Sequence, residues 1–188
     1  VTTVEEKAED MIDLYLANEW DNAQTMLDTI VSNQSKIMTD MQVNQMPPST
    51  RYAFNYLVYR LQRLSADQSQ PIQAGLAANE ITSIMIDLAG YYVYVVPLEV
   101  SRMDYLGREI VMLAQVKDNY GLLNMRISQM QDNWNTLAAI IRSKKGEKIA
   151  EQVDTDINRI RSEKAGPQMI NDANDILNLV DEMEALFQ

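Results

Sequence analysis

Apolar residues recur every three or four positions along most of the chain. The first run consists of Ile12, Leu16, Trp20, Ala23, Leu27, Ile30, Ile37 and Met41. Because this spacing puts apolar side chains on one face of a helix, it predicts amphipathic helices that pack against one another. The first stripe extends from Val4 to Met46, and the pattern alone leaves open whether that helix is continuous.

Proline and glycine mark the expected turns. The helical pattern breaks near Pro47, Pro97 and Gly146, since proline lacks a backbone donor and disfavours helix in the residue before it. Three short connections predict four long helices of about 40 to 47 residues, ~60 to 70 Å each at 1.5 Å per residue. Short connections join antiparallel neighbours, so we expect an all-α fold, an elongated up-down-up-down four-helix bundle. Pro71 and Pro167 lie inside the second and fourth helices and are expected to kink them.

The segment 91–96 reads YYVYVV and has the composition of a β-strand. The three-four spacing of apolar residues nevertheless runs into this segment, and the chain offers no second strand to pair with it. We therefore expect the second helix to continue to Pro97.

The second half of the chain resembles the first. The matched segments are Leu61-Gln62-Arg63-Leu64 with Ile157-Asn158-Arg159-Ile160 and, after a one-residue slip, Ala78-Asn79-Glu80-Ile81 with Ala173-Asn174-Asp175-Ile176. Pro71 and Pro167 follow the first pair at equal distances. Such a repeat indicates two similar units that bury their apolar faces. We expect one domain over residues 1–188 made of two duplicated helical hairpins, with halves of about 1–96 and 97–188.

Trp20 and Trp134 open similar stretches, but their register disagrees with the rest of the repeat. Either the first hairpin carries an insertion or the match is fortuitous, and the sequence leaves both open. In either case we expect the two indoles to fill the core.

Composition excludes several kinds of chemistry. The chain has no Cys and no His, so a thiolate nucleophile, a disulfide, a Cys/His zinc site and a Ser-His-Asp triad are impossible. Its formal charge is −11, and no basic stripe appears, which argues against nucleic acid as a partner. We assign no metal ligands and expect no cofactor.

No apolar run reaches the roughly 18 to 20 residues that a transmembrane helix needs. The chain begins at Val1 rather than Met. From this we expect an exported, periplasmic protein, with a lipoprotein whose leader has been removed as one form of it.

Two polar pairs recur within the apolar helix stripes, Asn79-Glu80 and Asn174-Asp175. Two carboxylates and two amides facing a bundle axis suit a hard cation or a polar ligand. The alternative is a structural contact between helices, with the amide inside and the acid in water.

A second set of candidate ligand-binding acids is Glu99, Asp104 and Glu109. They form either an acidic pocket near the tyrosines of segment 91–96 or a structural network. Asp104 and Arg108 are four residues apart, a spacing that favours a salt bridge on a helix.

The first turn is rich in methionine and aromatic residues, a composition typical of adaptable contact surfaces. The candidate partner-binding residues are Met38, Met41, Met46, Tyr52, Phe54 and Tyr56. We expect the partner to be another protein.

The segment Ala78-Asn79-Glu80-Ile81, followed by Tyr91, Pro97 and RMDYLGRE over 102–109, resembles a poorly characterised group of exported bacterial helical-bundle proteins. The resemblance implies an exported bundle and carries no activity. The sequence thus predicts a non-enzymatic binding or interaction module. The alternatives are a carboxylate-lined bundle that binds metal or a small ligand, and a structural spacer in an envelope assembly.

Overall fold

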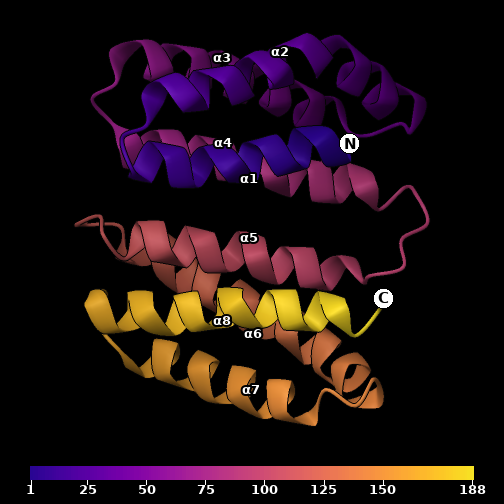
Figure 1. The fold of residues 1–188 in the computed structure, drawn as a ribbon, viewed down its shortest axis with the longest axis vertical. Helices are drawn as coiled ribbons and strands as arrows, with labels where there is room; N and C mark the ends of the chain where they lie inside the picture. Colours follow the sequence, from indigo (N-terminus) through magenta and orange to yellow (C-terminus); the bar gives the residue numbers. More distant parts are fainter. The chain divides into compact units, whose positions relative to one another are not determined.

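The computed structural model describes all 188 residues as eight α-helices with no β-strand, which confirms the all-α class (Figure 1). The helices are α1 (Thr2–Leu16), α2 (Trp20–Val43), α3 (Pro48–Asp67), α4 (Pro71–Ala89), α5 (Leu98–Leu113), α6 (Tyr120–Ser143), α7 (Glu147–Ser162) and α8 (Pro167–Ala185). None of them is long and apolar enough to cross a lipid bilayer.

The chain divides into two compact units, unit 1 over Val1–Val93 and unit 2 over Tyr94–Gln188. In unit 1, α1 packs on α2, α2 on α3, α3 on α4, and α4 closes the ring on α1. Unit 2 repeats this order, with α5, α6, α7 and α8 in the corresponding places (Figure 1). Each unit is therefore a four-helix arrangement with its own apolar core.

The expected four long helices are wrong, because each is divided in two. Pro71 and Pro167 do not kink a helix but begin α4 and α8. Proline suits that place, since its φ is already helical and a first-turn residue needs no N–H bond. The first helix ends at Leu16, and Asn18 (φ 60°) and Gln68 (φ 54°) adopt the left-handed conformation that turns the chain after α1 and α3.

Segment 91–96 is also not helical. α4 ends at Ala89, and Tyr91 to Val95 form an exposed connection without a helical or strand ladder. Pro97 disfavours helix in the residue before it, and β-branched valines stabilise helix poorly once no core holds them. The Tyr92 hydroxyl accepts a hydrogen bond from Asn44 at 3.2 Å.

The two tryptophans lie at different places in their units. Trp20 is the first residue of α2 and packs against the Tyr15 ring with 5.1 Å between centroids. Trp134 lies in the middle of α6, and its indole N–H donates to Asp154 on α7 at 2.6 Å. Both are buried, as expected, but they are not equivalent positions.

Candidate functional sites

The predicted partner-binding tip of the first turn is divided by the fold. Met41, Met46 and Phe54 are buried in the core of unit 1, and Met38 is half-buried. Only Tyr52 and Tyr56 are exposed, at 75% and 53% of their surface. The three buried residues hold the helices together, so they are not available to a partner.

Sequence reasoning missed the continuation of this exposed surface along α3. Tyr52, Tyr56, Tyr59 and Arg63 follow one another at helical spacing of four, three and four residues, which places them on one face. The opposite face of α3 carries Phe54, Leu57, Leu61 and other buried residues. The alternation of buried and exposed aromatics at this spacing was a signal available in the sequence.

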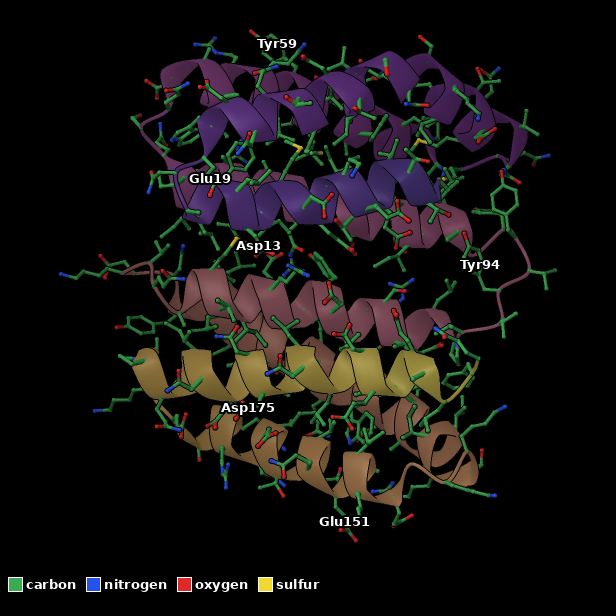
Figure 2. All side chains as sticks on the ribbon, in the orientation of Figure 1. Asp13, Glu19, Tyr59, Tyr94, Glu151 and Asp175 are labelled. Carbon is green, nitrogen blue, oxygen red and sulfur yellow. The ribbon has the colours of Figure 1, made fainter.

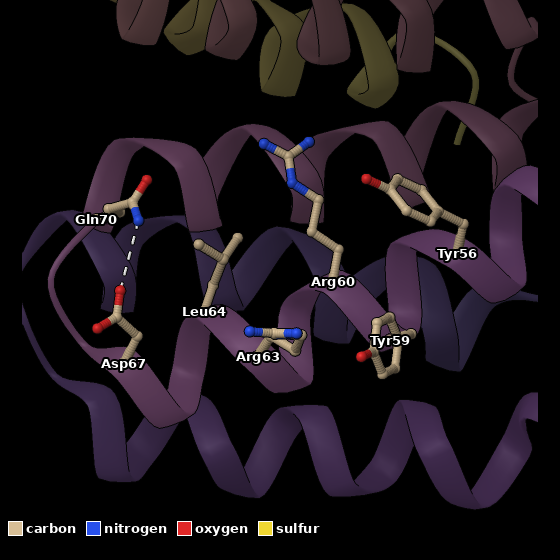
Figure 3. A pocket seen from close by; sticks show the side chains of 7 residues that line it. All are labelled: Tyr56, Tyr59, Arg60, Arg63, Leu64, Asp67 and Gln70. Atoms are coloured by element: carbon tan, nitrogen blue, oxygen red, sulfur yellow. Dashed lines mark hydrogen bonds between the residues drawn. The ribbon is translucent and has the colours of Figure 1, made fainter.

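The end of that face is hollowed. Tyr56, Tyr59, Arg60, Arg63, Leu64, Asp67 and Gln70 line a hollow of about 580 Å³, here called the α3 hollow (Figure 3). One guanidinium is positioned from the neighbouring helix, because Arg60 donates to Gln73 of α4 at 3.1 Å. A hydrogen bond with Tyr59 raises the pKa of the Arg63 guanidinium. The two fixed positive charges make the α3 hollow suited to anionic groups.

Charge is distributed unevenly in unit 1. Of its five Lys and Arg residues, three lie on α3, namely Arg51, Arg60 and Arg63, and Asp67 is the only acid on that helix. The remaining helices of unit 1 carry mostly acids. The α3 hollow is thus a local cationic site on an acidic protein.

The two predicted polar pairs belong to different units and differ in burial. On α4, Asn79 is fully buried and Glu80 is half-buried. On α8, Asn174 and Asp175 are both exposed. Neither unit contains both pairs, so neither core is lined by the predicted set of two amides and two acids.

The acids of α5 do not form a common pocket. Asp104 pairs with Arg108 at 2.7 Å, the expected salt bridge. Glu109 is buried and pairs with Arg126 of α6 at 3.0 Å. Glu99 is half-buried near the start of α5, where its backbone carbonyl accepts from the Asn133 side chain at 2.7 Å. Asp104 and Glu109 each form an ion pair with a different arginine. This arrangement is the structural network of the two alternatives and not the acidic pocket.

A carboxylate cluster that the sequence reasoning largely missed lies between α7 and α8. It consists of Asp156, Asp172 and Asp175, whose nearest oxygens all lie within 4.8 Å of one another. Asp156 and Asp172 are 0% and 2% exposed, whereas Asp175 faces solvent (Figure 2). The available signal was an acid within the apolar stripe Val153, Asp156, Ile157, Ile160.

Polar neighbours satisfy the carboxylate cluster in part. Gln152 donates to both oxygens of Asp156 at 2.9 and 3.0 Å. Arg159 lies 3.4 Å from Asp156 and 3.8 Å from Asp172. Burial raises the pKa of Asp156, with Asp175 and Asp172 acting in the same direction. The cluster therefore holds more negative charge than its neighbours neutralise.

Comparison with known proteins gives no family for the chain. No protein-family model, no curated protein and no solved structure matches it. The resemblance to exported helical-bundle proteins stays a prediction, and function is argued from the two sites.

Proposed function

We propose that the protein is a non-enzymatic binding module and that α3 of unit 1 binds an acidic segment of a partner protein. The observation that carries this proposal is the α3 hollow, where exposed tyrosines and two arginines share one helix face. The exported location expected from the sequence stays a prediction.

The residue types of this face favour a protein partner. Tyrosine and arginine dominate the binding energy of protein interfaces, because they offer large contact area together with directed hydrogen bonds. The arginine fork matches the two oxygens of a carboxylate. Tyr52, Tyr56 and Tyr59 supply the apolar contact, and Arg60 and Arg63 supply the charge.

The positive charge of α3 favours a partner segment that is acidic rather than neutral. Concentrated positive charge on α3 stands out against a chain of formal charge −11. Salt screens such attraction over a Debye length of about 8 Å at physiological ionic strength. The binding is therefore expected to weaken as salt increases.

We further propose that the two units are copies of one ancestral four-helix unit. In support, α2 and α6 both have 24 residues, α4 and α8 both have 19, and the latter two both begin at proline. In the matched segments of α3 and α7, Arg63 aligns with Arg159 in the sequence. This equivalence lets the two units be compared residue by residue.

The test is a selection of displayed random peptides on the full chain. Wild type should enrich peptides rich in Asp and Glu with interspersed aromatic residues. The double variant Arg60→Ala/Arg63→Ala should lose at least about tenfold in affinity for these peptides, because two charge-assisted contacts are removed. Tyr56→Ala should weaken the same peptides.

Matched controls come from unit 2. Tyr120 is exposed by 60% and Arg161 is exposed on α7, so Tyr120→Ala and Arg161→Ala remove similar groups from outside the α3 hollow. Peptides that bind these controls and the α3 variants equally well would contradict the proposal. Failure to enrich any peptide would favour the structural spacer.

A further inference from the structure

The carboxylate cluster of unit 2 has a feature that its protein neighbours do not explain. Asp172 is 2% exposed, yet no N–H donor of the protein reaches its Oδ2 or the buried Oε2 of Glu163, and the two carboxyl groups have only each other as hydrogen-bonding neighbours there. Burying a carboxylate oxygen without a partner costs several kcal/mol, at roughly 1 to 3 for each unsatisfied group and more when it is charged. A cation bound beside Asp172 and the two further carboxylates would neutralise this buried negative charge.

We propose that the α7–α8 hairpin binds one Ca²⁺ through Asp156, Asp172 and Asp175. This site lies in unit 2 and does not depend on the proposed role of α3. It uses one residue of the predicted ligand set, Asp175, and two that the sequence did not single out.

The spacing of the oxygens fits calcium. Ca²⁺ binds oxygens at about 2.3 to 2.6 Å, so two ligands on one ion can be as far as about 5 Å apart. The three carboxylate oxygens lie within 4.8 Å of one another, inside that limit. Mg²⁺ binds at about 2.0 to 2.1 Å in strict octahedral geometry, which limits two ligands to about 4.2 Å. Ca²⁺ thus accepts a wider spacing of its ligands than Mg²⁺ does, and its coordination geometry is less strict.

The three acids have complementary surroundings. Asp156 is held by Gln152, which donates to both of its oxygens, so this ligand is already oriented. Asp175 is exposed, which gives the ion a path from solvent and leaves room for water ligands. Calcium takes 6 to 8 oxygens and commonly completes its shell with water.

Arg159 is the competing cation of this site. Its Nη1 lies 3.4 Å from Asp156 and 3.8 Å from Asp172, but its side chain is 53% exposed. The guanidinium itself loses little when it turns into water, because its side chain is already half exposed, and a bound ion would replace its charge beside the two buried carboxylates. Ca²⁺ can thus displace the guanidinium, and removing Arg159 should strengthen calcium binding.

The experiment uses the full chain, treated with EDTA and dialysed into metal-free buffer, and titrates CaCl₂ by isothermal calorimetry. Wild type should bind one Ca²⁺ per chain and should unfold at a higher temperature with calcium than without it. Asp172→Asn and Asp175→Asn should each weaken binding by about tenfold or more, since affinity follows the number of charged ligands. Arg159→Gln should bind more tightly than wild type.

Controls remove similar charges from the same helices. Glu151 points away from the bundle on α7 (Figure 2) and Asp181 is exposed on α8, so Glu151→Gln and Asp181→Asn should retain wild-type affinity. Arg161→Gln is the control for Arg159→Gln.

The exposed position of Asp175 keeps the experiment decisive even where Asp172→Asn fails to fold, which circular dichroism would reveal. The absence of saturable binding up to about 10 mM CaCl₂, tenfold above the weakest extracellular calcium modules, would overturn the proposal. So would binding that Asp175→Asn leaves unchanged.

Discussion

The α3–α4 hairpin of unit 1 and the α7–α8 hairpin of unit 2 share one plan but differ in charge. In the matched segments, Arg63 corresponds to Arg159, and three residues earlier Arg60 corresponds to Asp156. Arg60 helps to line the cationic α3 hollow, whereas Asp156 belongs to the carboxylate cluster. The same place on the two hairpins thus suits an anion in one unit and a cation in the other.

This difference distinguishes the apolar residues that fold both units from the charged residues in which the two units differ. Apolar stripes that pack the helices are present in both units, and they tolerate exchange of one apolar residue for another. In the register of the matched segments Ala78-Asn79-Glu80-Ile81 and Ala173-Asn174-Asp175-Ile176, the buried Asp172 of α8 corresponds to the buried Ala77 of α4. A few polar residues therefore change the charge of the site without changing the arrangement of helices.

The largest expected effect comes from emptying the equivalent core positions Leu61 and Ile157, which are 0% and 1% exposed. Leu61→Ala and Ile157→Ala should each lower the free energy of unfolding by about 2 to 5 kcal/mol, because truncation leaves a cavity. The rate of backbone amide hydrogen exchange, measured peptide by peptide with mass spectrometry, should increase most in α1–α4 for Leu61→Ala and in α5–α8 for Ile157→Ala. Equal acceleration in both units by either variant would show that the cores are not separate.

A transplant of unit 1 residues into unit 2 should abolish the difference in charge. The double variant Asp156→Arg/Asp172→Ala gives the α7–α8 hairpin the residues that the α3–α4 hairpin has at these places. It should reduce Ca²⁺ affinity more than tenfold, because two of three charged ligands are lost. Calorimetry measures the effect, and Glu151→Arg is the control for an added positive charge on α7. Calcium binding that survives the transplant would place the cation elsewhere.

The helical class was accessible from the sequence, but the number of helices was not. Periodicity identifies a helical face, yet it continues across a short break when the next helix presents apolar residues in a compatible phase, as Leu16 and Trp20 do. Pro71 and Pro167 gave the correct positions of two further breaks, and the error was to treat them as kinks. Helix-first prolines and mid-helix prolines look alike without the residues that turn the chain before them, such as Gln68.

The sites were less accessible for a related reason. Asp156 and Asp172 lie on different helices, and only the packing of α7 on α8 brings them together. Phe54 and Met41 are residue types that are common in contact surfaces, but their exposure depends on which side of the helix faces the core, and both are buried. Tyr52 and Tyr56 are aromatic like Phe54, but they lie on the other side of the helix and are exposed.

Each unit also contains a polar contact between helices, partly buried in unit 2 and buried in unit 1, and the two should differ in strength. In unit 2, Asp154 accepts from Trp134 at 2.6 Å and from Arg142 at 2.6 Å. Asp154→Ala should lower the free energy of unfolding by about 1 to 3 kcal/mol, because the buried indole N–H loses its acceptor. Denaturant unfolding measures this, and Asp154→Asn, which keeps an acceptor oxygen, should cost less.

The counterpart in unit 1 joins the Tyr15 hydroxyl to Ser65 at 2.7 Å. This bond is between neutral groups, so Tyr15→Phe should cost only about 0.5 to 1.5 kcal/mol. An equal or larger cost for Tyr15→Phe than for Asp154→Ala would show that the charged acceptor gives unit 2 no advantage.

The smallest expected effect concerns Glu184 near the end of α8, at a place where α4 has the buried Ala89. Burial raises the pKa of Glu184, and the neighbouring Asp181 and Asp104 raise it further. The folded state therefore holds this proton more tightly than the unfolded state does. Glu184 favours folding fully below its unfolded pKa, and this contribution is lost as pH rises through the folded pKa.

Glu184→Gln should consequently unfold at a slightly higher temperature than wild type at pH 7, and the two proteins should converge at pH values below about 4, where the unfolded carboxyl is protonated as well. Thermal unfolding across this pH range measures the difference. Glu182→Gln removes an equal charge from an exposed position on the same turn and separates local burial from the general effect of lowering the net negative charge. If both variants gain equally at pH 7, the gain comes from the overall charge of the chain and not from a carboxylate placed where the first unit has a buried alanine.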